Sequence, residues 1–202
     1  MKEDVKKEYR ELFDATTKSI DTVVVPEFQF LMIDGVGNPQ TEDFKLKSKA
    51  LNIMAKAIRA YYKQKDGSTY LISPLEGLWD TYDNAKFDVT RKKMIRYTLM
   101  ISQPRYLTPE VFDEVKENVV ARKTNPYLKD IYLKKFEEGQ SVQMLHIGPY
   151  NTEIMTTKEI MEYIIVQNMK LNGMHHEIYL NNPEKVIPAK LKTIVRYAVV
   201  DI

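Results

Sequence analysis

The second half of the chain repeats a pattern of its first half at an offset of about one hundred residues. Residues 95–101 (IRYTLMI) recur as residues 195–200 (VRYAVV). An apolar segment with a single glutamate precedes each copy, around Glu76 in the first half and Glu177 in the second. Two copies are too few for a solenoid, which needs about three or more repeats to be stable. The sequence therefore predicts a duplicated module whose two copies face each other across a cleft.

Composition narrows the class of protein. The 202 residues are 44% hydrophobic, which is enough for one domain with a full core. The absence of cysteine excludes disulfides and thiol chemistry. The net charge of +2 comes from interspersed basic and acidic residues without a basic stripe, so we expect no direct binding of nucleic acid. The N-terminus is charged and no apolar run approaches about 18 residues, which predicts a cytoplasmic protein that does not enter membranes.

Hydrophobic periodicity predicts an α+β fold with antiparallel sheets and helices packed on one face. The expected helices cover residues 4–17, 42–64, 109–123 and 151–172, the last of them ended by Gly173. The expected strands cover residues 22–33, 69–79, 94–102, 131–136, 141–147, 175–180 and 193–202, with a polar loop at 80–93. Each half then reads strand, long helix, strand, strand, over about 22–104 and 105–202.

Glu177 is the first candidate for a functional side chain. On a strand, His175, Glu177 and Tyr179 share one face, while Ile178 and Leu180 share the other. We expect the isoleucine and leucine to lie under the helices and Glu177 to point to the opposite face, where the cleft would be.

A carboxylate in such a cleft has two interpretations. Burial would raise the pKa of Glu177, and it could then act as a general base or pair with a cationic ligand. Alternatively, Glu177 is a structural carboxylate, hydrogen-bonded to a loop or paired with Arg96 or Arg196. The strand alone does not separate these alternatives.

Glu76, Trp79 and Tyr150 are further candidates. Glu76 occupies the segment equivalent to that of Glu177, but alternation places it opposite Trp79 unless a bulge at Gly77 shifts the register. Trp79 is the only tryptophan, either a core residue or a wall on which a planar ligand stacks. Tyr150 follows a glycine turn at the start of the second long helix, where its hydroxyl could reach a ligand or hold the turn.

The remaining candidates are weaker. We expect Tyr179, His146, Met100 and His175 to contact the ligand as well. His175 and His176 point to opposite faces of a strand and cannot chelate a metal together, and the spacing to His146 matches no metal signature. No phosphate-binding glycine loop is present. We therefore expect neither a metal nor a cofactor.

Several motifs together resemble one known family. They are residues 32–39 (MIDGVGNP), 74–79 (PLEGLW), 100–104 (MISQP), 138–150 (EGQSVQMLHIGPY) and 175–180 (HHEIYL). From about residue 20 to its end, the chain resembles the GyrI-like small-molecule-binding proteins, in their stand-alone branch. The resemblance implies a single domain over 1–202, in which two modules are related by a pseudo-twofold axis with a ligand cleft between them.

The resemblance also implies a range of functions. In regulators that carry this domain, the cleft is aromatic and a buried glutamate, on a strand resembling that of Glu177, neutralises cationic planar drugs. Stand-alone members are linked to hydrolysis of the cyclopropane in planar DNA-alkylating natural products, and others are named for modulating DNA gyrase. Many relatives have a second aromatic after the tryptophan, whereas Trp79 is followed here by Asp80. One wall of the pocket would then be polar.

Three hypotheses follow. In the first, the protein binds planar aromatic or cationic molecules and hydrolyses a strained electrophile, with Glu177 as base, Tyr150 or Tyr179 as acid and Trp79 as a stacking wall. In the second, it sequesters or senses the same ligands without changing them. In the third, it modulates a protein such as DNA gyrase, for which the interspersed charges offer little support. We expect a monomer or a homodimer.

Overall fold

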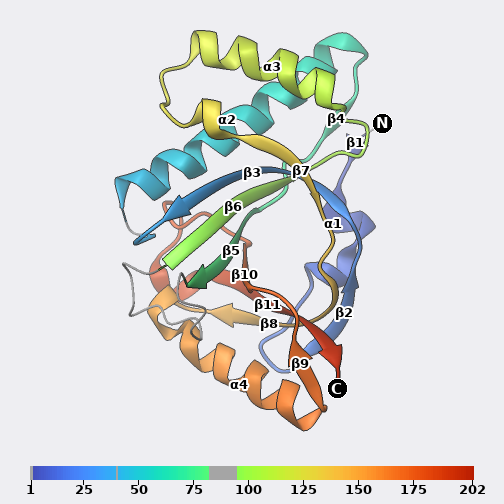
Figure 1. Cartoon of the computed structure of the whole chain (residues 1–202), viewed down its shortest axis with the longest axis vertical. Helices are drawn as coiled ribbons and strands as arrows, with labels where there is room; N and C mark the ends of the chain where they lie inside the picture. Colours follow the sequence, from blue (N-terminus) through green and yellow to red (C-terminus); the bar gives the residue numbers. More distant parts are fainter. Residues whose placement is uncertain (1, 40, 82–94) are drawn as a thin grey trace.

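A single nine-stranded sheet runs through the computed structural model, which describes residues 2–39, 41–81 and 95–202 (Figure 1). Eight of its strands follow the order β2-β8-β11-β10-β5-β6-β3-β7, every neighbouring pair is antiparallel, and β9 pairs with β11. The bounds are β2 Asp21–Val25, β3 Phe28–Val36, β5 Leu75–Thr81, β6 Ile95–Gln103, β7 Tyr132–Phe136, β8 Gly139–Ile147, β9 Met169–Leu171, β10 His175–Tyr179 and β11 Lys192–Asp201. The predicted antiparallel α+β fold is confirmed.

The two halves of the chain meet at the centre of the sheet. On one side lie β5, β6 and β3, and on the other lie β10, β11 and β8, so both halves have the same strand order. The antiparallel pair β5–β10 joins them. A pseudo-twofold axis between the halves stays a prediction, but the central pair places the two glutamate-bearing strands side by side.

Three helices cover one face of this sheet. Helix α2 (Glu42–Lys65) contacts β3 and β6, α3 (Pro109–Arg122) packs on α2, and α4 (Glu153–Val166) contacts β8 and β11 (Figure 1). Trp79 belongs to the core beneath α2, and its cross-strand neighbour His175 shares a face with Val195, which belongs to the core beneath α4. All three helices therefore pack on the same face. No helix within the described ranges is long and apolar enough to cross a membrane.

The opposite face is covered by the N-terminal segment, where the predicted helix at 4–17 is wrong. Helix α1 is a single turn (Val5–Glu8), followed by a 3-10 turn at Arg10–Leu12. Two side chains of the sheet form hydrogen bonds with the backbone of this 3-10 turn. The Gln143 amide donates to the carbonyl of Glu11, and Arg196 donates to that of Leu12. These two contacts tie the segment to the sheet along a path that is not helical.

Three predicted segments between residues 22 and 93 also differ from the structure. Pro26 and Glu27 divide the strand at 22–33, so β2 pairs with β8 while β3 pairs with β6 and β7. The strand at 69–79 is also two strands, β4 (Thr69–Tyr70), which pairs with β1 (Lys2–Glu3), and β5. Of the predicted loop at 80–93, residues 80 and 81 belong to β5 and the rest lies outside the described residues.

Helix α4 ends at Val166 and not near residue 172. Asn168 adopts φ 56°, a left-handed conformation that asparagine tolerates, and β9 follows at once. Gly173 does not end this helix, as was predicted. It allows a close approach to β11, because a Cβ atom on Gly173 would lie 3.0 Å from the Cβ of Ala198. Helices α2 and α3 begin at the predicted residues, Glu42 and Pro109, and each is preceded by a threonine, Thr41 or Thr108, whose hydroxyl oxygen accepts a backbone N–H group.

Because Gly35 has no side chain, the buried ring of Tyr97 can lie directly over it. A Cβ atom on Gly35 would lie 2.2 Å from Cζ of Tyr97, whose ring is 3% exposed. We expect Gly35→Ala to displace this ring and to lower the free energy of unfolding by about 1–3 kcal/mol. Urea denaturation measures the change. An unchanged denaturation midpoint would show that the ring is free to move aside.

Candidate functional site

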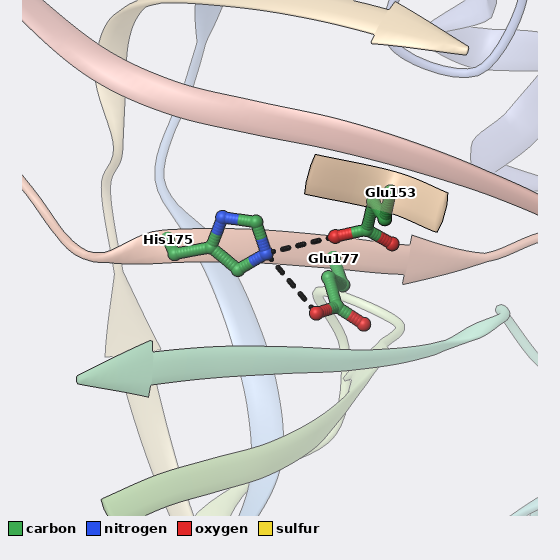
Figure 2. A group of neighbouring side chains, drawn as sticks. All are labelled: Glu153, His175 and Glu177. Carbon is green, nitrogen blue, oxygen red and sulfur yellow. Dashed lines mark hydrogen bonds and ion pairs between the residues drawn. The ribbon is translucent and has the colours of Figure 1, made fainter. Parts of the chain in front are cut away.

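Two carboxylates and an imidazole meet on the helix-covered face of the sheet (Figure 2). His175 Nε2 lies 3.1 Å from Oε1 of Glu153 and 3.0 Å from Oε1 of Glu177. His175 and Glu177 alternate along β10 and so share a face, while Glu153, the first residue of α4, approaches from above that face. All three are buried, and Glu177 is the most exposed of them, at 8%.

Tyrosines surround this cluster. The Tyr197 hydroxyl is hydrogen-bonded to Nδ1 of His175, and the Tyr179 hydroxyl interacts with the Glu177 carboxylate. The ring of Tyr150 packs edge-on against that of Tyr179, with centroids 5.9 Å apart. Tyr150 is 38% exposed, so it links the buried cluster to the surface of the molecule.

The cluster holds a proton on its imidazole. Burial opposes a charge on His175, but hydrogen bonds to Glu153 and Glu177 outweigh it and raise the pKa of His175 well above its ordinary value. Its Nε2–H then donates to the two carboxylates, and its Nδ1–H donates to the oxygen of Tyr197. Burial, together with the nearby charge of Glu177, raises the pKa of Glu153 to about 7. The cluster therefore exchanges one further proton with solvent near neutral pH.

The two tyrosines beside Glu177 remain neutral at that pH. Burial and then the charge of Glu177 raise the pKa of Tyr150 to about 12, and the same two causes raise the pKa of Tyr179 well above its ordinary value. A buried carboxylate thus faces two phenolic groups that keep their protons. This combination of an acceptor and donors can move protons to and from a bound molecule.

The raised pKa of Glu153 predicts how stability depends on pH. A carboxyl group whose pKa rises on folding from its ordinary 4.5 to about 7 binds its proton more tightly in the folded state than in the unfolded state. The contribution of this group to stability is therefore complete below pH 4.5 and is lost as pH increases to about 7. Glu153→Gln removes this loss. We expect the variant to gain melting temperature relative to the natural protein between pH 5 and pH 8, by about 2–4 °C for each kcal/mol. A difference that is constant across this range would contradict the assignment.

The same three side chains carry donor atoms of the type that binds divalent metals. One atom each from Glu153, His175 and Glu177 lies within 4.8 Å of the others. The two carboxylate oxygens need a donor or a cation between them, either the proton on Nε2 or a metal ion that displaces it. A test that separates these two follows from the proposed function below.

Glu177 does not lie on the face that the sequence predicted. The helices cover its own face, and the face of Ile178 is covered instead by the N-terminal segment, where Ile178 packs with Ala15 and Ile194. The prediction was wrong because an apolar strand face can be buried by an irregular segment as well as by a helix. The predicted grouping of His175, Glu177 and Tyr179 on one face is confirmed.

Glu76 lies on the other face of the sheet from Glu177. The register of the central pair sets Gly77 opposite Glu177 and Glu76 opposite Ile178, and β5 passes through without a bulge. Glu76 contacts His176 instead, at 3.0 Å between Oε2 and Nε2. The two glutamates of the sequence repeat are therefore not brought into one site.

Glu76 belongs to a second buried network beneath the N-terminal segment. His176 Nδ1 lies 2.9 Å from Glu138, and Arg196 Nη1 lies 3.4 Å from the same carboxylate. Burial opposes a charge on His176, but Glu138 and Glu76 outweigh it and raise its pKa to about 9. Burial alone would raise the pKa of Glu138, yet His176 and Arg196 lower it. Two cations thus balance two carboxylates on this face at neutral pH.

Of the other predicted contacts, His146 and Met100 have partners outside the cluster, whereas Trp79 lies beside it, opposite His175 in the β5–β10 pair. The His146 ring is hydrogen-bonded to the start of α4, with Nδ1 3.0 Å from the hydroxyl oxygen of Thr156. Met100 is fully buried in the core of the opposite face, beside Leu78. Trp79 is 3% exposed, and its ring stacks on that of Phe44, so its position is that of a core residue.

Neither arginine that was considered as a partner of Glu177 contacts it. Arg96 forms an ion pair with Asp80, and Arg196 belongs to the network on the opposite face. Glu153, in contrast, was missed. An acidic residue in the first turn of a helix usually indicates a favourable interaction with the helix dipole, so only its place three residues after the motif at 138–150 could have marked it.

The candidate site is thus a buried carboxylate–imidazole cluster beside a partly exposed tyrosine on the sheet of an α+β protein. The chain belongs to the family of the GyrI-like small molecule binding domain, which it matches over residues 19–198. No curated protein matches it.

Solved structures agree with this assignment. An uncharacterized conserved protein from Listeria innocua is 33% identical, with a TM-score of 0.90 over 98% of this chain and 100% of that one. Two proteins described as hydrolases from the same organism are each 31% identical. Their TM-scores are 0.88, over 99% of this chain, and 0.85, over 98%, and both are covered in full.

Proposed function

We propose that this protein binds planar aromatic or cationic small molecules beside Glu177 and hydrolyses a strained electrophile within them. The substrate class is a cyclopropane ring conjugated to a carbonyl group, as in DNA-alkylating natural products, so the reaction would protect a cell from genotoxins. The observation that carries the proposal is the position of Glu177, a buried carboxylate held by a protonated imidazole beside two neutral tyrosines. The relatives described as hydrolases support it.

The chemistry requires one base and one acid. Glu177 accepts a proton from a water molecule as the water oxygen bonds to a cyclopropane carbon. The carbon–carbon bond of the ring breaks, and its electron pair moves through the conjugated system to the carbonyl oxygen, which becomes a phenolate. Tyr150 or Tyr179 donates to that oxygen, and the proton held by Glu177 restores the balance. The product is the substrate plus one water.

The neighbours of Glu177 prepare it for this role. His175 donates to Oε1 at 3.0 Å and fixes the direction of the carboxylate, while Tyr197 holds the far side of the imidazole. Burial keeps bulk water away, which strengthens each of these interactions. General acid–base groups that are positioned in this way contribute about 10²–10⁴-fold to a rate.

Product analysis tests the proposal directly. We expect a duocarmycin-type compound with an intact cyclopropane to gain one water over many turnovers, and ¹⁸O to appear in the product when the reaction runs in labelled water. Mass spectrometry measures both. Recovery of the intact compound, protected from solvent by the protein, would contradict hydrolysis.

Metal removal distinguishes the shared proton from a bound ion. If the positive species among Glu153, His175 and Glu177 is the proton on Nε2, turnover should be unchanged after dialysis against a strong chelator and unchanged on adding Zn²⁺ or Mn²⁺ at stoichiometric levels. Loss of turnover on chelation and its return with one of these ions would instead assign the cluster to a metal.

A binding role without chemistry is the second candidate function. Above the pKa of Glu153, two carboxylates share one imidazolium, and the cluster carries a net negative charge. Such a site favours cations. Under this alternative, Glu177→Gln weakens a cationic planar ligand far more than a neutral ligand of the same shape, and calorimetry on such a pair of ligands would show it.

A further inference from the structure

The indole N–H of Trp79 is a buried donor to which the described residues give no hydrogen-bond partner. The side chain is 3% exposed. Most buried N–H groups in proteins are paired, and an unpaired one lowers stability, so an exception calls for a reason. Stacking on a ligand is not that reason, since the ring already stacks on Phe44 and has no face open to solvent.

The indole nitrogen of Trp79 lies over Gly77, at the edge of the candidate site. A Cβ atom on Gly77 would lie 2.8 Å from Nε1 of Trp79 and 3.2 Å from the hydroxyl oxygen of Tyr179. Gly77 is also the residue directly opposite Glu177 in the β5–β10 pair. Two donors, one from each half of the chain, therefore converge over the single position beside Glu177 that carries no side chain.

We propose that the indole N–H of Trp79 binds the carbonyl oxygen of the ligand, and that the Tyr179 hydroxyl, which donates to Glu177 in the free protein, turns to the same oxygen as negative charge grows on it. The inference rests on the proposed function and extends it. It makes Trp79 a hydrogen-bond donor to the substrate rather than a stacking wall. An indole N–H can only donate a hydrogen bond. This position therefore disfavours a cation and favours an oxygen atom with lone pairs.

The arrangement suits a developing oxyanion. Both rings are held by packing before the ligand arrives, Trp79 by Phe44 and Tyr179 by Tyr150, so the indole N–H needs no rearrangement and the O–H of Tyr179 needs only a rotation away from Glu177. Donors that need no rearrangement in a site with little water are the usual means of stabilising such a charge. As the cyclopropane bond breaks, its electron pair reaches the oxygen between the two donors, and Glu177, released by the Tyr179 hydroxyl, takes the proton of the attacking water.

A substrate class follows from this geometry. The ligand must carry a carbonyl oxygen conjugated to the strained ring, because only such an oxygen collects the charge where the donors lie. The ligand would enter past Tyr150, the exposed member of the group. A planar molecule of the same shape without the carbonyl lacks the contact, and the N–H of Trp79 then stays unpaired.

The single tryptophan allows a direct test. The chain has one indole N–H, so a ¹H–¹⁵N correlation spectrum contains one such resonance. We expect xanthone, a planar unreactive ketone, to move this resonance downfield and to slow its exchange with solvent. Xanthene, which has a methylene group in place of the carbonyl, controls for ring currents and should cause neither effect. A resonance that responds equally to both compounds, or to neither at their solubility limits, overturns the inference.

Kinetics supply a second test that does not depend on these probes. Trp79→Phe keeps an aromatic ring and removes the donor, and we expect kcat for the duocarmycin-type compound to fall about 10²-fold with KM nearly unchanged. Tyr97→Phe is the control, since Tyr97 packs against the same indole ring with centroids 5.2 Å apart, and the variant removes a buried hydroxyl there while both rings and the N–H stay in place; its kcat should stay within about threefold. Equal losses in both variants would show that Trp79 acts only through packing.

The two proposals fail in different ways. If the natural protein hydrolyses the compound and Trp79→Phe does so equally well, the donor role is wrong and the hydrolase proposal stands. If no hydrolysis occurs but xanthone alone moves the indole resonance, the donor role stands as a binding contact and the hydrolase proposal is wrong.

Discussion

Replacing Glu177 by glutamine is expected to lower kcat for cyclopropane opening by about 10²–10⁴-fold, the range that a positioned general base contributes. Glutamine has nearly the same shape and can still accept from Nε2 of His175, which lies 3.0 Å from the carboxylate oxygen. It cannot accept a proton from water. The fold should therefore remain intact while the attacking water loses its base, and the loss should fall on kcat rather than on KM for a neutral substrate.

Glu153→Gln provides the matched comparison for this result. Both carboxylates contact the same nitrogen of His175, at 3.1 Å and 3.0 Å, but Glu153 lies at the helix terminus and Glu177 faces the tyrosines. We expect Glu153→Gln to change kcat far less than Glu177→Gln. Equal losses would mean that the two carboxylates act as one unit, and an unchanged rate in Glu177→Gln would remove it from the mechanism.

Replacing Arg196 by methionine is expected to lower the free energy of unfolding by about 3–5 kcal/mol, which is typical when one partner of a buried ion pair is removed. Arg196 is 3% exposed and donates to Glu138, to the side chain of Gln143 and to the carbonyl of Leu12. Methionine fills the space and leaves these acceptors unpaired. Urea denaturation measures the loss, and limited proteolysis should show earlier cleavage in the N-terminal segment that Leu12 anchors.

The sequence repeat supplies a control for this substitution. Arg96 occupies the equivalent place in the first half but pairs with Asp80 with about half of its side chain exposed to solvent, so Arg96→Met should cost much less. Similar losses at both positions would contradict the assignment of a buried network. The network should also weaken in alkali: a histidine whose pKa rises on folding from 6.5 to about 9 stabilises the fold fully below pH 6.5 and loses this contribution as pH rises through 9.

Local patterns in the sequence were enough to predict much of the fold. The helix starts at Glu42 and Pro109 were predicted from patterns that act within a few residues, and the alternation along β10 correctly grouped His175 with Glu177. The bounds that failed depend on distant contacts. The N-terminal segment departs from a helix because Arg196, far along the chain, binds its carbonyl at Leu12.

The candidate site shows the same division between local and distant information. Glu177 was identified from its strand, but the partner Glu153 could not be, because the distance between them in space is set by how α4 packs on β8 and β11. The expectation for Glu76 failed for a related reason. The repeat suggested that Glu76 corresponds to Glu177, whereas the pairing of β5 with β10 sets Gly77 in that place. Register is a property of two strands, and one strand alone does not contain it.

The alternation of charges along β10 also limits how the gene can change. His175 and Glu177 serve one face and His176 the other, so removing a single residue within this strand would carry the carboxylate into the apolar layer beneath the N-terminal segment and Ile178 into the tyrosines. Both faces would lose their charge balance in one step. The connection at 181–191 carries no such constraint, since its residues are mostly exposed. Insertions and deletions should therefore accumulate in that connection during evolution and be purged from the five residues of the strand.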